Sequence, residues 1–97
     1  MNLAKSTKRI AKRVKNGFQG YPQINLAYHG KTTDYATQVV VTLLCEEGAE
    51  PQSQTFTSST NVKKDETIQT TLLKVIERSD AKTVAEVEGI LPIALNN

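Results

Sequence analysis

The sequence feature that most constrains the fold is an apolar run at Tyr35–Cys45, YATQVVVTLLC. Its middle is β-branched, and it contains neither Gly nor Pro. β-Branched side chains fit a pleated strand better than a helix, and the run has the length of a strand. Apolar residues occupy both odd and even positions, which is typical of a strand buried on both faces. The run therefore predicts the central strand of a sheet.

Two further strands are predicted beside this run. In residues 23–29, the apolar Ile24, Leu26 and Tyr28 alternate with polar residues, which is the pattern of a half-buried strand. A turn containing Gly joins this segment to the central run, as in a β-hairpin. Residues 52–60, QSQTFTSST, follow a second turn and are rich in Ser and Thr. They suit the solvated edge of a sheet, and a loose loop is the alternative.

Two segments have the periodicity of helices. Residues 1–16 form a predicted basic amphipathic helix, with Leu3, Ile10 and Val14 on one stripe and Lys and Arg over the rest. Residues 65–79 place apolar side chains at the i, i+4, i+7 and i+8 spacing of a helix that faces a core.

The tail at residues 83–93 admits two interpretations. Its first four residues have the form of a helix capping box, whereas its β-branched residues favour a strand. We expect a strand. With a three-stranded meander at 22–60, the elements predict one domain over residues 1–97. The fold class is α+β, a two-layer sandwich in the order α-β-β-β-α-β. Its mainly antiparallel sheet has three or four strands, and both helices lie on one face.

Charge is distributed unevenly along the chain. The net charge is +2, but residues 1–15 hold six Lys and Arg and no acid. The remaining residues hold the other six cations and all ten acids. A basic segment on an acidic body is typical of proteins that bind nucleic acid, a membrane surface or an acidic partner. A basic, acid-free N-terminus also resembles an organellar transit peptide.

Residue types suited to catalysis or metal binding are scarce. The chain has one His and one Cys, and it lacks the P-loop, GxGxxG, HExxH and CxxC motifs. His29 near Asp34 is a general-base candidate, but we favour a solvated turn histidine because no nucleophile accompanies it. Cys45 is interpreted as a core or strand-end residue. The acidic turn at 46–50 lacks the spacing of a known calcium loop. We therefore expect a protein that is not an enzyme and holds no metal or cofactor.

The sequence also bears on localisation. The longest apolar stretch, Val39–Cys45, is far shorter than a membrane span. The basic N-terminus is not followed by the apolar region of a signal peptide. A single cysteine fits a reducing compartment, so we expect a cytoplasmic protein.

The basic N-terminal helix predicts a function in binding. Dense cations attract phosphate backbones, because binding releases condensed counterions. Lys31 in the first turn, and Lys63 and Lys64 before the second helix, extend this surface, although Asp65 and Glu66 follow them directly. The predicted nucleic-acid-binding residues are Lys5, Lys8, Arg9, Lys12, Arg13, Lys15, Lys31, Lys63 and Lys64.

A protein-interaction module is the alternative hypothesis. The polar strand at 52–60 presents an unpaired edge, to which a partner or a second copy can add a strand to form a homo-oligomer. The basic helix would then bind an acidic protein surface. Attachment of this helix to a membrane surface is a third hypothesis, which its small, Trp-free apolar face disfavours.

The order helix, three strands, helix is similar to that of the double-stranded-RNA-binding domain. That family has basic residues at the start of its second helix, where Lys63-Lys64 stand here. Its minor-groove turn, Gly-Pro-x-His, reads His29-Gly30-Lys31 here, and its Lys-Lys-x-Ala-Lys run reads Lys63-Lys64-Asp65-Glu66-Thr67. The residues from Ala81 onward are additional. The resemblance therefore lies in the order of the elements alone. It implies an α+β fold but no activity, because fold does not imply function.

Overall fold

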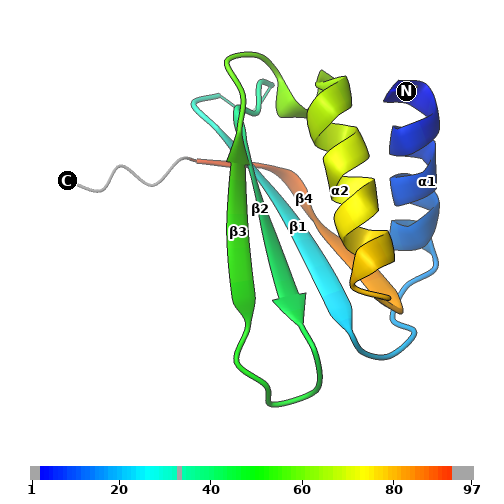
Figure 1. Ribbon diagram of the computed structural model, residues 1–97. Coiled ribbons are helices and arrows are strands. Elements are labelled where there is room, and N and C mark those ends of the chain that lie inside the picture. Colours follow the sequence, from blue (N-terminus) through cyan, green and yellow to red (C-terminus); the bar gives the residue numbers. More distant parts are fainter. Residues whose placement is uncertain (1–2, 33, 93–97) are drawn as a thin grey trace.

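In the computed structural model, which describes residues 3–32 and 34–92, the chain folds into a layer of two helices and a layer of four strands (Figure 1). The elements are α1 (Leu3–Lys15), β1 (Gln23–Gly30), β2 (Gln38–Leu44), β3 (Gln52–Thr57), the short 3-10 helix η1 (Val62–Lys64), α2 (Glu66–Arg78) and β4 (Thr83–Pro92). The predicted α+β sandwich with both helices on one face is confirmed, and so is the final strand. Residues 1–2, 33 and 93 of the predicted segments lie outside the described residues.

The sheet has the strand order β3-β2-β1-β4. The pairs β1–β2 and β2–β3 are antiparallel, whereas β4 runs parallel to β1. The chain leaves β3 at one edge of the sheet, crosses the sheet through α2 and returns as β4 at the other edge (Figure 1). A helix in this connection supplies the length that parallel pairing requires. The sheet is therefore mixed, with two antiparallel pairings and one parallel pairing.

The core lies between the helices and one face of the sheet. The alternation predicted for the first strand is confirmed, because Ile24, Leu26 and Tyr28 of β1 are all buried on the helix side. The buried apolar side chains are Ile10, Ile24, Leu26, Tyr28, Ala36, Val39, Val41, Val62, Ile68, Leu72, Leu73, Ile76, Ala81 and Val84. Most of them are aliphatic, so the docking of the helices on the sheet depends on how closely these apolar side chains pack together.

The apolar run at Tyr35–Cys45 forms β2 only from Gln38, and β2 is an interior strand as predicted. The expectation that both of its faces are buried was wrong. The helices cover one face, and Val40 and Leu44 on the other face are only half-buried. Cys45 follows β2 directly and is exposed, so it is a strand-end residue and not a core residue. Apolar, β-branched residues on both faces of a segment favour a strand, but they do not show whether another layer covers each face.

The two helices lie side by side, and both begin at the same end of the domain (Figure 1). The N-terminus of α2 is capped by Asp65, whose carboxylate accepts a hydrogen bond from the backbone N–H of Ile68 at 3.1 Å. Its apolar face buries Ile68, Leu72 and Ile76, as its spacing predicts. Among the described residues, no helix is long and apolar enough to cross a membrane.

Candidate polyanion-binding surface

Helix α1 is docked on the domain through its narrow apolar stripe. Ile10 is 3% exposed, and Val14 is partly buried against the same core. The hydroxyl groups of Ser6 on α1 and Thr70 on α2 lie 3.4 Å apart. Packing of an amphipathic face supplies most of the stability of a helix of this length. The fold therefore holds α1 in a fixed orientation.

This docking turns most of the cations of α1 toward solvent. The helix contains no acidic residue. Its exposed cations are Lys5, Lys8, Arg9, Lys12 and Lys15. Within the described residues, no side-chain hydrogen bond or ion pair engages four of them: Lys8, Arg9, Lys12 and Lys15. We call these five exposed residues the α1 cationic face.

The sixth cation of the helix has a different place. Arg13 is half-buried, and its guanidinium group donates a hydrogen bond to the carbonyl oxygen of Ala81, in the turn after α2. Glu77 of α2 lines a shallow groove with Arg9 and Lys12. The cationic face is therefore bordered on its α2 side by the carboxylate of Glu77.

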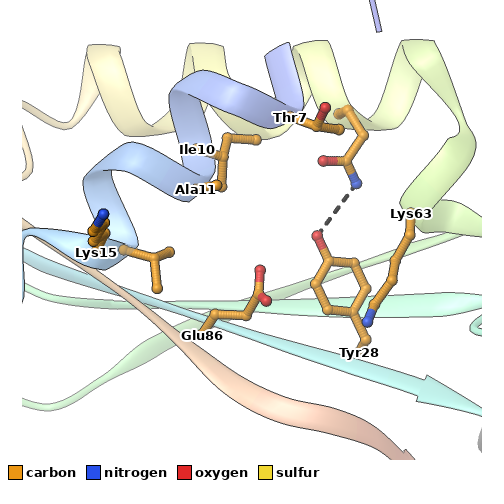
Figure 2. Close-up of a pocket in the computed structure, with 9 residues that line it drawn as sticks. Thr7, Ile10, Ala11, Lys15, Tyr28, Lys63 and Glu86 are labelled. Atoms are coloured by element: carbon orange, nitrogen blue, oxygen red, sulfur yellow. Dashed lines mark hydrogen bonds between the residues drawn. The ribbon is translucent and has the colours of Figure 1, made fainter. Parts of the chain in front are cut away.

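The structure places the other three predicted cations at the end of the domain where α1 begins. Lys31 follows β1, and Lys63 and Lys64 belong to η1. Lys31 and Lys64 are exposed, whereas the ammonium group of Lys63 lies 4.9 Å from the centre of the Tyr28 ring. This cation–π contact holds Lys63 beside Tyr28 at one end of a cavity next to α1 (Figure 2). The nine predicted residues thus divide between the outer side of α1, this end of the domain, and two inward positions, Arg13 and Lys63.

The N-terminus of α2 is occupied by its own carboxylate. Asp65 accepts hydrogen bonds from the N–H of Ile68 and, at 2.9 Å, from the hydroxyl of Ser58. These bonds, first that from Ile68 and then that from Ser58, hold the pKa of Asp65 below its ordinary value. A negative charge already stands where a phosphate would bind, so the α1 cationic face is the stronger candidate site.

A cavity of about 390 Å³ lies between α1 and the sheet (Figure 2). Ile10, Ala11 and Val14 form its apolar wall on the helix side. The carboxylate of Glu86 on β4 points toward this wall, and Lys15 lies at one end of the cavity (Figure 2). Apolar walls with a few polar groups are typical of small-molecule sites.

Tyr28 and Gln69 form the polar part of the cavity. The side-chain amide of Gln69 donates to the Tyr28 hydroxyl oxygen at 3.2 Å and to the carbonyl oxygen of Val62 at 3.0 Å. Burial raises the pKa of Tyr28, the charge of Glu86 raises it further, and the bond from Gln69 opposes this shift. Tyr28 is therefore a neutral phenol at physiological pH.

Two residues considered for catalysis, His29 and Cys45, lie near opposite ends of β2. The ring Nδ1 of His29 lies 3.2 Å from the carbonyl oxygen of Pro92, and the backbone N–H of Asp34 donates a hydrogen bond to the hydroxyl of Thr32. Cys45 is exposed at the other end of β2. Among residues 3–32 and 34–92, no group of three or more His, Cys, Asp or Glu side chains is placed to hold a metal ion.

The cluster of Tyr28, Gln69, Lys63 and Glu86 was missed by sequence reasoning. Its members come from β1, α2, η1 and β4, so no local spacing connects them. The only usable signal was the alternation in β1, which puts Tyr28 on the helix side. No family model, curated protein or solved structure matches the chain.

Proposed function

We propose that this protein binds polyanions, most simply nucleic acid, through the α1 cationic face. The observation that supports this proposal is the outward display of cations on a helix without acids, while the opposite side of the same helix is docked in the core. Because α1 is already folded and docked, little backbone ordering is needed when a polyanion binds. Cations that neutralise phosphates release condensed counterions, and this release favours binding.

The length of the α1 cationic face determines how many phosphates it can contact. Lys5 and Lys15 are ten residues apart, which corresponds to about 15 Å along a helix. About four phosphates of one strand lie within that length of B-DNA. α1 contains no aromatic residue for stacking on bases. We therefore expect contacts with the backbone and little preference for sequence.

Fluorescence anisotropy titrations test the proposal. The intact protein is titrated against labelled duplex DNA, duplex RNA and single strands at several salt concentrations. With about four phosphate contacts, we expect log K for duplex DNA to fall against log salt with a slope of about −3.5. The absence of binding at low salt to any of these nucleic acids overturns the proposal.

Charge-matched double variants locate the binding surface. Lys8→Gln with Lys12→Gln removes two cations of the α1 face, and the slope should become shallower by about 2. Lys31→Gln with Lys64→Gln removes the same charge from the end of the domain and should leave the slope almost unchanged. Equal effects of the two pairs would show that net charge, and not α1, determines binding. Substitution is preferable to deletion of α1, because Ile10 is part of the core.

A further inference from the structure

Strand β3 leaves one edge of the sheet uncovered. Five of its six residues are exposed, and only Phe56 is half-buried. On one side β3 pairs with β2, and neither helix reaches over it in the two-layer arrangement (Figure 1). An edge strand exposes a row of unpaired N–H and C=O groups that another strand can use.

The two edges of this sheet differ in whether they carry features that prevent pairing with another strand. The other edge, β4, carries Glu86 and Glu88, ends at Pro92 and contains an irregularity at which its register with β1 shifts. Gly89, with φ of 80°, lies within this irregularity. Charges, Pro and bulges are the features that block edge pairing. In contrast, β3 is uncharged, contains no Pro and keeps a regular register with β2 over its whole length.

The hydrogen bonds of the hairpin show which groups of β3 face outward. Ser58, directly after β3, donates its N–H to the carbonyl oxygen of Thr37 at 2.9 Å. Because backbone groups alternate between the two sides of a strand, Phe56 and Gln54 also point toward β2. Ser53, Thr55 and Thr57 therefore point their N–H and C=O groups away from the sheet. Their side chains all lie on the helix-free face, opposite Phe56.

From this edge we infer that two copies of the chain pair through β3, antiparallel about a two-fold axis at Thr55, to form one continuous eight-stranded sheet. In this register Thr55 faces Thr55 of the second copy, and Ser53 faces Thr57. All three outward-facing residues then form hydrogen-bonded pairs, and their hydroxyl groups line up on one face. The same face already holds such a pair across the hairpin, between Thr42 and Ser53 at 3.1 Å.

Charge favours a second copy in this orientation. Residues 52–60 contain no charged side chain, so they offer nothing to select a charged peptide. The exposed carboxylates Glu46, Glu47 and Glu50 lie in the loop that enters β3. Antiparallel pairing places the two loops at opposite ends of the interface, whereas parallel pairing would bring these like charges together. Two-fold symmetry produces the antiparallel arrangement by itself.

Sedimentation equilibrium of the full chain, without nucleic acid, tests this inference. We expect a monomer–dimer equilibrium for the wild type. Thr55→Pro removes an outward N–H and spares the β2 ladder, so it should raise the dissociation constant at least about tenfold. Thr55→Ala is the matched control, because it keeps the N–H and should still dimerise. A monomeric wild type at millimolar concentration, or a folded Thr55→Pro variant that dimerises like Thr55→Ala, overturns the inference.

Two further measurements remain decisive if Thr55→Pro fails to fold. Thr55→Lys keeps the backbone donor but places two ammonium groups opposite each other across the axis, so their repulsion should make the variant monomeric at low salt.

The second measurement is a distance between spin labels on the single Cys45, which is exposed. A strand rise of about 3.3 Å and a strand spacing of about 4.8 Å place the two labels roughly 35 Å apart in the dimer. A dimer with a distance far from this value, or a Thr55→Lys variant that dimerises as well as the wild type at low salt, contradicts β3 pairing. The Lys8→Gln, Lys12→Gln variant should dimerise normally, which separates this test from that of polyanion binding.

Discussion

The guanidinium group of Arg13 donates a hydrogen bond to the carbonyl oxygen of Ala81 and so joins the end of α1 to the turn between α2 and β4. In that turn Asp80 adopts a left-handed conformation, with φ of 55°, which ends α2. One cation of the basic helix thus acts within the fold, while its neighbours face solvent. This division predicts that stability and polyanion binding depend on different cations of the same helix.

Replacement of Arg13 tests this division. Arg13→Met keeps an apolar stem but leaves the Ala81 carbonyl without its charged donor, so the free energy of unfolding should fall by about 1–2 kcal/mol. Arg9→Met removes an exposed cation and should change stability by less than about 0.5 kcal/mol while weakening binding to duplex DNA. Urea unfolding and anisotropy measure the two effects. The same loss of stability in both variants would contradict a structural role specific to Arg13.

Gln69 should be among the polar residues most important for stability. It is 2% exposed, and its amide serves both the Tyr28 hydroxyl and the Val62 carbonyl. Gln69→Leu leaves both oxygens without this donor, and we expect a loss of about 2–4 kcal/mol. Tyr28→Phe removes only one acceptor and should cost about 1 kcal/mol. The double variant, measured by urea unfolding, should be more stable than the sum of the two single losses predicts. The reason is that the phenyl ring that replaces Tyr28 has no hydroxyl group left without the Gln69 donor. Strictly additive losses would contradict the hydrogen bond between Tyr28 and Gln69.

Local patterns in the sequence predicted the elements of this fold well. Alternation in Ile24, Leu26 and Tyr28 indicated the strand and its buried face, and the Ser/Thr-rich segment after the second turn is an edge strand. The partial exposure of Val40 was not predictable, because an apolar side chain on a strand does not reveal whether a second layer covers it. The parallel pairing of β4 with β1 was not predictable either, since it joins segments about sixty residues apart.

The candidate site shows the same limit. The exposed cations of α1 follow directly from helical periodicity and the absence of acids. The inward placement of Arg13 and Lys63 depends on partners at Ala81 and Tyr28, which only the tertiary fold brings near. Sequence therefore identified the charged surface as a whole but not which of its residues are engaged elsewhere.

Gly30 should be the glycine least tolerant of substitution. It ends β1, and a Cβ atom there would collide with the backbone carbonyl of Tyr35. Because the backbone would have to move to relieve this collision, Gly30→Ala should lower the free energy of unfolding by about 3 kcal/mol. Gly48 has φ of 81° but open space around it, so Gly48→Ala should cost only about 1 kcal/mol through backbone strain. Thermal or urea unfolding ranks the two variants, and equal losses would contradict the close approach at Gly30.

The cap of α2 makes stability depend on pH in the acid range. The carboxylate of Asp65 accepts bonds from the Ile68 N–H and the Ser58 hydroxyl, and these lower its pKa in the folded protein. A group whose folded pKa lies below its unfolded pKa contributes its full stabilisation above the unfolded value, which is about 4 for Asp. That stabilisation is lost as the pH falls through the folded pKa.

Asp65→Asn retains a capping oxygen but cannot ionise, so it isolates this effect. At pH 7 the variant should be less stable than the wild type by about 0.5–1 kcal/mol, because a neutral acceptor binds the N–H of Ile68 more weakly than a carboxylate does. As the pH falls below about 4, the carboxylate protonates first in the unfolded chain and then, below its lowered pKa, in the folded protein, so the difference between the two proteins should shrink toward zero. Urea unfolding from pH 7 to about pH 3 measures this convergence. Glu66→Gln, at the adjacent exposed position, is the control. A difference between wild type and Asp65→Asn that stays constant with pH would contradict the lowered pKa of Asp65.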